Sequence, residues 1–447
     1  MKKTGRNLYR QRLLAIALPI IMNNIIAQLQ MIIDRIFLGH ANDLYMSALG
    51  NVSSPVWTTM SFCNSLVMGA SILISQSVGA GKREDIGEYA GAMMKYNNII
   101  PVFLCFFWLF FPKPVFTLLG VSDSVMLLCL SYVRWYAPLF LLTGLGGSLG
   151  VVLQTSNYTR PLVVYGLFRS GLNIFLDWVL IFGKFGMPEL GIEGAAIATV
   201  IAEYVGAIYI SVIYFTSKKL TTRPRWNNVK RGHFRSYLHS AKLGINIALE
   251  DFAWNIGNLI MIRILNSINE YAAGIYTIVF GVEVLAVVII GAIGSGTMTL
   301  TSEATGKRDL AQYKGTTLCA FGICVIVTVL MILGAVLFPE QILSLFTSDK
   351  AIIASSGIYL LMIGFNLFSK SGNIIVGNAI RGSGNTKWML YTQIFGTIWI
   401  VSVAAVFVFV CKLGILGVFL AVMADEGVRA LINLWKYLRI VKEWKSA

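Results

Sequence analysis

The chain alternates between long apolar runs and short polar segments along most of its 447 residues. About 20 apolar residues in a row is the length at which an α-helix crosses the hydrocarbon core of a bilayer. Twelve runs meet this length, and the segments between them carry glycine, proline and charged residues typical of loops. The pattern therefore predicts an all-α membrane protein with twelve transmembrane helices. The expected spans are 14–38, 55–78, 90–111, 127–153, 162–182, 192–215, 243–265, 273–298, 316–338, 352–380, 389–411 and 415–438.

Lysine and arginine are concentrated in every second polar segment. They precede the first run, follow the second, fourth, eighth and tenth runs, and fill the longest polar stretch, residues 217–242. Cytoplasmic loops carry such an excess of basic residues. We therefore expect a multi-pass protein of a bacterial-type plasma membrane, with the lipid bilayer as its surroundings and both termini in the cytoplasm.

The two halves of the chain repeat one another in their polar loops. SVGAGKRED after the second run corresponds to SEATGKRD after the eighth, which places Lys82 and Lys307 225 positions apart. GIEG at Gly191 likewise corresponds to GILG at Gly414. Six helices is an even number, so both copies insert with the same topology and form a parallel repeat. We expect an N-terminal six-helix lobe at 1–216, a cytoplasmic basic linker at 217–242 and a C-terminal six-helix lobe at 243–447.

The amino-acid composition narrows the class of protein further. Hydrophobic residues make up 56% of the chain and charged residues 13%, with a mean hydropathy of +0.72, which excludes a soluble domain. The net charge of +15 is explained by the basic loops, and without a clustered basic face we expect no nucleic-acid partner. The chain has no GxxxxGK[ST], no HExxH and no CxxC. We therefore expect no enzyme, no metal centre, no cofactor and no obligate protein partner.

Several polar residues interrupt the apolar runs of the first half. Asn173 and Asp177 are four residues apart and share one helix face. An aspartate near mid-membrane costs about 2.5–3.5 kcal/mol on insertion scales, so its side chain should face the bundle or a wet cavity. Thr199 returns to the same depth on the next run, and Asp34 lies in the later part of the first. Such oxygens could surround a hard cation such as Na⁺, with Asp34 and Asp177 as its carboxylates, or share a proton.

Plainer interpretations of the same residues stay open. Asp34 could pair with the adjacent Arg35 or extend to the membrane surface. Asn173 and Asp177 could clamp two helices by hydrogen bonds.

Charged residues also interrupt the second half. Glu250 and Asp251 lie in the seventh run, and Lys370 lies in the tenth. Because a lysine would repel a bound sodium ion, we hypothesise a buried ion pair between Lys370 and Glu250 or Asp251. Five further charged residues lie in the apolar runs. We expect Arg169, Glu203 and Glu426 to be structural, whereas the roles of Glu283 and Asp425 stay open.

Four stretches of the sequence resemble the multidrug and toxic compound extrusion (MATE) transporters: IIDRIFLGH, GASILISQSVGAGKRED, NIFLDWVLIFGKFGMPELGIEGAAIAT and AIRGSGNTK. The resemblance covers essentially the whole chain. It implies two six-helix lobes facing each other in a V around a central cavity, with export driven by proton or sodium antiport. It also implies that Asp34, Asn173, Asp177 and Thr199 couple the cation. Glu250 matches an acid of one branch of the family, whereas Lys370 departs from that branch.

Taken together, we expect a secondary active multidrug efflux transporter that exports amphipathic, cationic organic compounds by proton or sodium antiport. The alternative on the same fold is a flippase or exporter of a lipid-linked or biosynthetic molecule, which a cavity rich in arginine and lysine would favour. A channel is disfavoured because the repeat and the buried carboxylates suit alternating access better.

Overall fold

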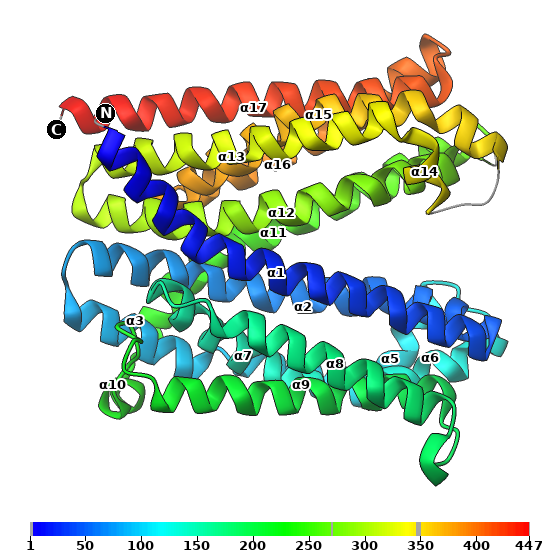
Figure 1. Ribbon diagram of the computed structural model, residues 1–447, viewed down its shortest axis with the longest axis horizontal. Coiled ribbons are helices and arrows are strands. Elements are labelled where there is room, and N and C mark those ends of the chain that lie inside the picture. Colours follow the sequence, from blue (N-terminus) through cyan, green and yellow to red (C-terminus); the bar gives the residue numbers. More distant parts are fainter. Residues whose placement is uncertain (1–2, 270, 346–349, 447) are drawn as a thin grey trace. The chain divides into compact units, whose positions relative to one another are not determined.

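The computed structural model describes residues 3–269, 271–345 and 350–446, and every regular element in those ranges is a helix (Figure 1). This confirms the predicted all-α fold. The first half contains α1 (Lys3–Ala41), α2 (Asp43–Gly79), α3 (Arg83–Tyr96), α4 (Ile99–Phe110), α5 (Pro112–Leu118), α6 (Asp123–Tyr136), α7 (Leu139–Thr155), α8 (Pro161–Ile181), η1 (Lys184–Gly186), α9 (Gly191–Thr216) and α10 (Trp226–Arg231). The second half contains α11 (Phe234–Asn266), α12 (Ala272–Lys307), α13 (Leu310–Leu337), α14 (Pro339–Ser344), α15 (Lys350–Gly382), α16 (Thr386–Ala405), η2 (Val406–Val410) and α17 (Gly414–Ser446).

Most of the expected spans correspond to helices that are long and apolar enough to cross a membrane. Among the described residues there are nine, or ten if the bent pair α6 and α7 is one span. The other two expected spans fall on α11 and α17, each 33 residues long. Charged side chains interrupt the apolar runs of both, Glu250 and Asp251 in α11 and Asp425, Glu426 and Arg429 in α17.

The chain forms two compact units. The N unit comprises residues 18–74 and 82–245, and the C unit comprises 1–17, 75–81 and 246–447. Helices α1, α2 and α11 each contribute residues to both. The lobe and linker boundaries at 1–216, 217–242 and 243–447 remain a prediction.

The core of the N unit brings α8 and α9 very close together. Large side chains such as Trp108, Phe116 and Phe140 are fully buried in one hydrophobic cluster of this unit. At Gly194 of α9, a Cβ atom would lie 2.7 Å from the backbone carbon of Leu180 on α8. Small residues allow helix backbones to approach in this way. The hairpin α8–α9 is therefore a tightly packed scaffold for the polar residues that it carries.

The segment around α10 also belongs to the N unit and packs on α3. At Gly91 of α3, a Cβ atom would lie 2.4 Å from the carbonyl oxygen of Asn228. The Nζ atom of Lys95 donates to the carbonyl oxygens of Lys230 and Gly232 at 3.0 and 3.3 Å. The predicted linker thus contains a short helix held against α3 by close backbone packing at Gly91 and by the Lys95 side chain.

In the C unit, α12, α13, α15 and α17 are neighbours that run along the long axis of the view (Figure 1). Helix α16 packs against α17. The rings of Tyr276 of α12 and Phe419 of α17 contact each other in the core, with their centroids 5.8 Å apart and their planes tilted by 48°. The first turns of α1 and the last turns of α17 lie at the same end of this unit.

Candidate cation-binding site

The N unit brings together the four residues that the sequence singles out in the first half of the chain. Asp34 of α1 and Asp177 of α8 are within side-chain hydrogen-bonding distance of each other. In one amide orientation, Asn173 donates to the hydroxyl of Thr199 on α9 at 3.4 Å. In the other, which satisfies both amide atoms, its nitrogen lies 3.1 Å from an Asp34 carboxylate oxygen. The cluster therefore joins three helices, and its role as a cation-coupling site remains a prediction.

Burial makes this cluster energetically unusual. Asn173 and Asp177 are 0% exposed, whereas Asp34 and Thr199 are half-buried. Among the residues that the structure describes, the Oδ1 atom of Asp177 has no hydrogen-bond partner. An unpaired buried carboxylate is costly, and a proton or a cation would remove that cost.

A second polar layer lies next to the carboxyl pair. Gln30, one turn before Asp34 on α1, accepts a hydrogen bond from Ser170 of α8 at 2.7 Å and also bonds to Asp34. Ser170 and Gln30 are both buried. A glutamine four residues from a candidate aspartate is a signal that the sequence contains and that we missed.

A third polar group of the N unit is an ion pair that faces a cavity. Arg169 of α8 donates to Glu203 of α9 at 2.5 Å, and the hydroxyl of Tyr165 donates to the same carboxylate at 2.5 Å. Tyr165 and Glu203 line a cavity of about 240 Å³, together with Asn64 and Thr143. Arg169 and Glu203 thus neutralise each other beside a space large enough for a small organic group.

The C unit corrects the hypothesis for Lys370. Its Nζ atom bonds to Glu283 of α12 at 2.7 Å and lies 3.8 Å from Glu426 of α17. Glu250 instead bonds to Arg381 of α15 at 2.6 Å, and Asp251 lies within electrostatic reach of the same guanidinium. The hypothesised pairing of Lys370 with Glu250 or Asp251 is therefore wrong.

The physical reason lies in the register between helices. Arg381 follows Lys370 by eleven residues, which is about three helical turns, so both project from one face of α15. Spacing within a helix identifies that face, but it does not fix how far a neighbouring helix is shifted along it. Helix α11 places Glu250 at the level of Arg381, and α12 places Glu283 at the level of Lys370.

Arg429 of α17 completes the charged network of the C unit. It bonds to Asp425 at 2.8 Å, lies 3.1 Å from Glu426, and donates to Gln393 of α16 at 2.8 Å. We did not expect a role for Arg429 from the sequence, although this residue follows Asp425 by one helical turn. Glu283 and Asp425, which the sequence left open, and Glu426, which we expected to be structural, are all buried ion-pair partners.

The network lines a small internal cavity. Its volume is about 50 Å³, and its walls include Trp254, Tyr276 and Phe280 besides the charged residues. Such a space holds a few water molecules. Within the described ranges, no group of three or more histidine, cysteine or acidic side chains is placed to hold a metal ion.

The fold and the buried polar clusters define a class of protein, a multi-pass helical membrane protein with carboxylates inside its helix packing. The sequence profile of the MatE family matches residues 19–179 and 247–408. The chain therefore belongs to the MATE family of transporters. It is a multi-pass membrane protein that transports small molecules and is not an enzyme.

Curated relatives cover nearly the full length. A probable multidrug resistance protein NorM of Thermotoga maritima is 29% identical over 446 residues, which cover 96% of this chain and 92% of that protein. The probable multidrug resistance protein YoeA of Bacillus subtilis is 26% identical, and the match covers 100% of this chain and 96% of that protein. Distant homology thus relates the chain to probable multidrug resistance proteins.

Solved structures share the fold. An outward-facing multidrug resistance MATE family transporter of the MOP superfamily matches with a TM-score of 0.90 and 19% identity, covering 98% of this chain and 97% of that chain. A second match is a MOP superfamily transporter from Pyrococcus furiosus, for which reverse polarity of the binding pocket suggests a different function. It matches with a TM-score of 0.89 and 19% identity, covering 100% of this chain and 99% of that chain.

Proposed function

We propose that the chain exports amphipathic, cationic organic compounds in exchange for protons or sodium ions. The observation that carries this proposal is the pair of carboxyl groups, Asp34 and Asp177, within hydrogen-bonding distance inside the N unit. Two carboxyl groups can share a hydrogen bond only if one holds a proton, and two carboxylates so close require a cation between them. The pair is therefore suited to bind one of the two coupling ions.

In the proposed cycle, a cation from outside binds at Asp34 and Asp177 and weakens the binding of the substrate. Asn173 and Thr199 add an amide and a hydroxyl oxygen, which are donors that a hard cation accepts. The ion can shift the protein between two states only if it binds one state more tightly. The unpartnered Oδ1 atom of Asp177 supplies such a difference, because it gains a partner when the ion binds.

We further propose that coupling resides mainly in the N unit. In the C unit, Lys370 and Arg429 already lie against Glu283, Asp425 and Glu426. The Lys370 ammonium also lies 5.8 Å from the centre of the Phe280 ring. The lysine thus provides a built-in cation in an acidic, aromatic-walled cavity, where a sodium ion would be repelled.

The test uses the purified protein in proteoliposomes with a fluorescent organic cation. An imposed pH gradient and an imposed sodium gradient are applied separately. We expect transport with one gradient only, which identifies the coupling ion, and loss of that transport to background in Asp177→Asn. The matched control is Asp85→Asn, at a 49% exposed carboxylate outside the cluster, which should transport like the wild type.

Normal gradient-driven transport by Asp177→Asn would overturn the central residue of the proposal. No movement of the organic cation under either gradient would instead favour the alternative, a flippase or exporter of a lipid-linked or biosynthetic molecule. That alternative needs free basic groups in a cavity. The bonding of Arg169 to Glu203 and of Lys370 to Glu283 argues for the cation exporter.

For orientation, we propose that the protein lies in a bacterial plasma membrane with both termini in the cytoplasm. The excess of basic residues before α1 and in the segment between α9 and α11 supports this orientation.

A further inference from the structure

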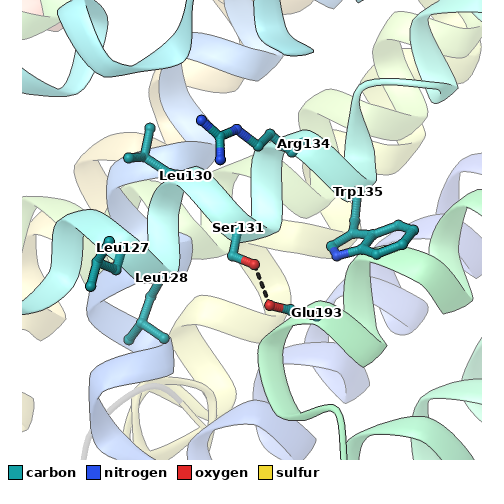
Figure 2. A pocket seen from close by; sticks show the side chains of 7 residues that line it. All are labelled: Leu127, Leu128, Leu130, Ser131, Arg134, Trp135 and Glu193. Atoms are coloured by element: carbon teal, nitrogen blue, oxygen red, sulfur yellow. Dashed lines mark hydrogen bonds between the residues drawn. The ribbon is translucent and has the colours of Figure 1, made fainter. Parts of the chain in front are cut away.

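The N unit carries a pocket that the proposed transport cycle does not use. It lies between α6 and the first turn of α9, is open to the surface, and has a volume of about 680 Å³ (Figure 2). Four apolar and three polar side chains line it, namely Leu127, Leu128, Leu130, Trp135, Ser131, Arg134 and Glu193. The pocket thus combines apolar walls with one side chain of each charge.

Its apolar residues are placed to contact lipid. Leu127 is 74% exposed and Trp135 is 50% exposed, and both lie in α6, the first part of the bent span α6–α7. In a helix that crosses a bilayer, exposed side chains of this kind contact acyl chains, and tryptophan favours the boundary with the headgroups.

Arg134 supplies the first specific feature. It is exposed on α6, and it has no hydrogen bond or ion pair with any residue that the structure describes. A free guanidinium on a lipid-facing surface is costly. The Arg134 side chain leans toward the first turn of α6, as long side chains in helices do. The anion available at a lipid-facing surface is a lipid phosphate, which matches the planar fork of an arginine.

Glu193 supplies the second feature. In Figure 2, its carboxylate meets Ser131, which donates to its Oε1 atom. Ser131 and Arg134 are three residues apart on α6 and are therefore neighbours on its surface, so Glu193 and Arg134 line the same pocket. The Oε2 atom of Glu193 has no bonded partner within the part of the chain that the structure describes. One carboxylate oxygen is therefore available to accept hydrogen bonds from an ammonium group.

We propose that this pocket binds a membrane phospholipid with a phosphoethanolamine headgroup. Arg134 binds the phosphate, Glu193 accepts hydrogen bonds from the primary ammonium, and an acyl chain packs along Leu127 and Trp135. A headgroup with both charges complements both side chains. An anionic headgroup without an amine leaves Glu193 without its partner, and a choline headgroup has no N–H to donate.

The test titrates delipidated full-length protein in detergent with dioleoyl phosphatidylethanolamine, phosphatidylcholine or phosphatidylglycerol. Bound lipid is counted by native mass spectrometry, and the melting temperature is recorded in parallel. We expect the wild type to prefer phosphatidylethanolamine by about tenfold over either other lipid, the effect of one charge-assisted hydrogen bond. Arg134→Ala should lose binding of all three lipids at this pocket. Glu193→Gln should keep binding but lose the preference for phosphatidylethanolamine.

The matched control is Arg263→Ala, which removes another exposed arginine without a described partner, at the end of α11. It should bind lipid like the wild type. Equal binding of the three lipids by the wild type, tighter binding of phosphatidylglycerol, or unchanged phosphatidylethanolamine binding by Arg134→Ala would each overturn the proposal. Because Arg134 is exposed, its variants should fold, and Arg134→Lys provides a second variant that retains the charge but not the planar fork.

Discussion

At the scale of single residues, the two units treat their buried acids differently. Within the described chain, Asp34 and Asp177 have no base bonded to either carboxylate, because the nearby Arg169 is bonded to Glu203. The buried acids of the C unit each lie against a lysine or an arginine, as Glu283 does against Lys370. An acid with a fixed partner cannot exchange ions at low cost. The N unit therefore has a site suited to ion exchange, whereas the ion pairs of the C unit are suited to stability.

This contrast predicts the stability of variants at the pair Lys370 and Glu283. Lys370→Met leaves a carboxylate buried without its partner and should destabilise the protein by about 3–5 kcal/mol. The double variant Lys370→Met with Glu283→Met should recover most of that loss, because two apolar side chains replace the pair. Thermal melts of the purified variants in detergent measure both effects. A double variant no more stable than the single would contradict the pairing.

Sequence alone identified the residues of the cluster in the N unit, but it did not identify the ion-pair partners in the C unit. Asn173 and Asp177 could be placed together because they share one helix face, and Thr199 because a short turn connects its helix to theirs. Glu283 and Lys370 are 87 positions apart on α12 and α15, and only the register between those helices brings them together. Hydrophobic periodicity predicts which face of a helix is buried, but it does not predict that register.

At the scale of elements, the cluster depends on the close packing of α8 and α9. Gly194→Ala would place a methyl group against the backbone of Leu180. Overpacking of this kind costs about 1–3 kcal/mol, so the variant should melt earlier and transport poorly. Gly171→Ala on α8 is the matched control, because a Cβ atom there meets nothing within 4 Å. It should be as stable as the wild type or slightly more stable. Equal behaviour of the two variants in melting and transport assays would contradict this dependence.

The predicted spans also differ from the observed elements where the chain bends. We expected one helix over residues 127–153, whereas α6 and α7 meet at an angle of 45°. Pro138 lies at the junction and lacks the N–H that would continue the helical hydrogen bonds. The residue was visible in the sequence, but a count of apolar residues does not register it.

At the scale of the whole molecule, the all-α class followed from apolar run length, because a membrane imposes one length on every span. The segment between α9 and α11 is different. We expected a basic linker from its composition, yet it contains α10, held against Gly91 and Lys95 of α3. Contacts to backbone atoms leave little trace in composition, so this part of the fold was not predictable.

The packing of α10 has a consequence for proteases. Trypsin must draw an extended stretch of chain into its active site, and the Lys230 carbonyl oxygen is bonded to Lys95. We expect trypsin to cut first after Lys218 or Lys219, which are exposed in the preceding turn, and to spare Lys230 despite its exposed side chain. Lys95→Ala should open the Lys230 site, and Lys82→Ala should not, as fragment masses over a digestion time course would record. Early cleavage after Lys230 in the wild type would mean that α10 detaches readily, whereas a protected site would make this basic stretch one of the chain's built-in defences against degradation.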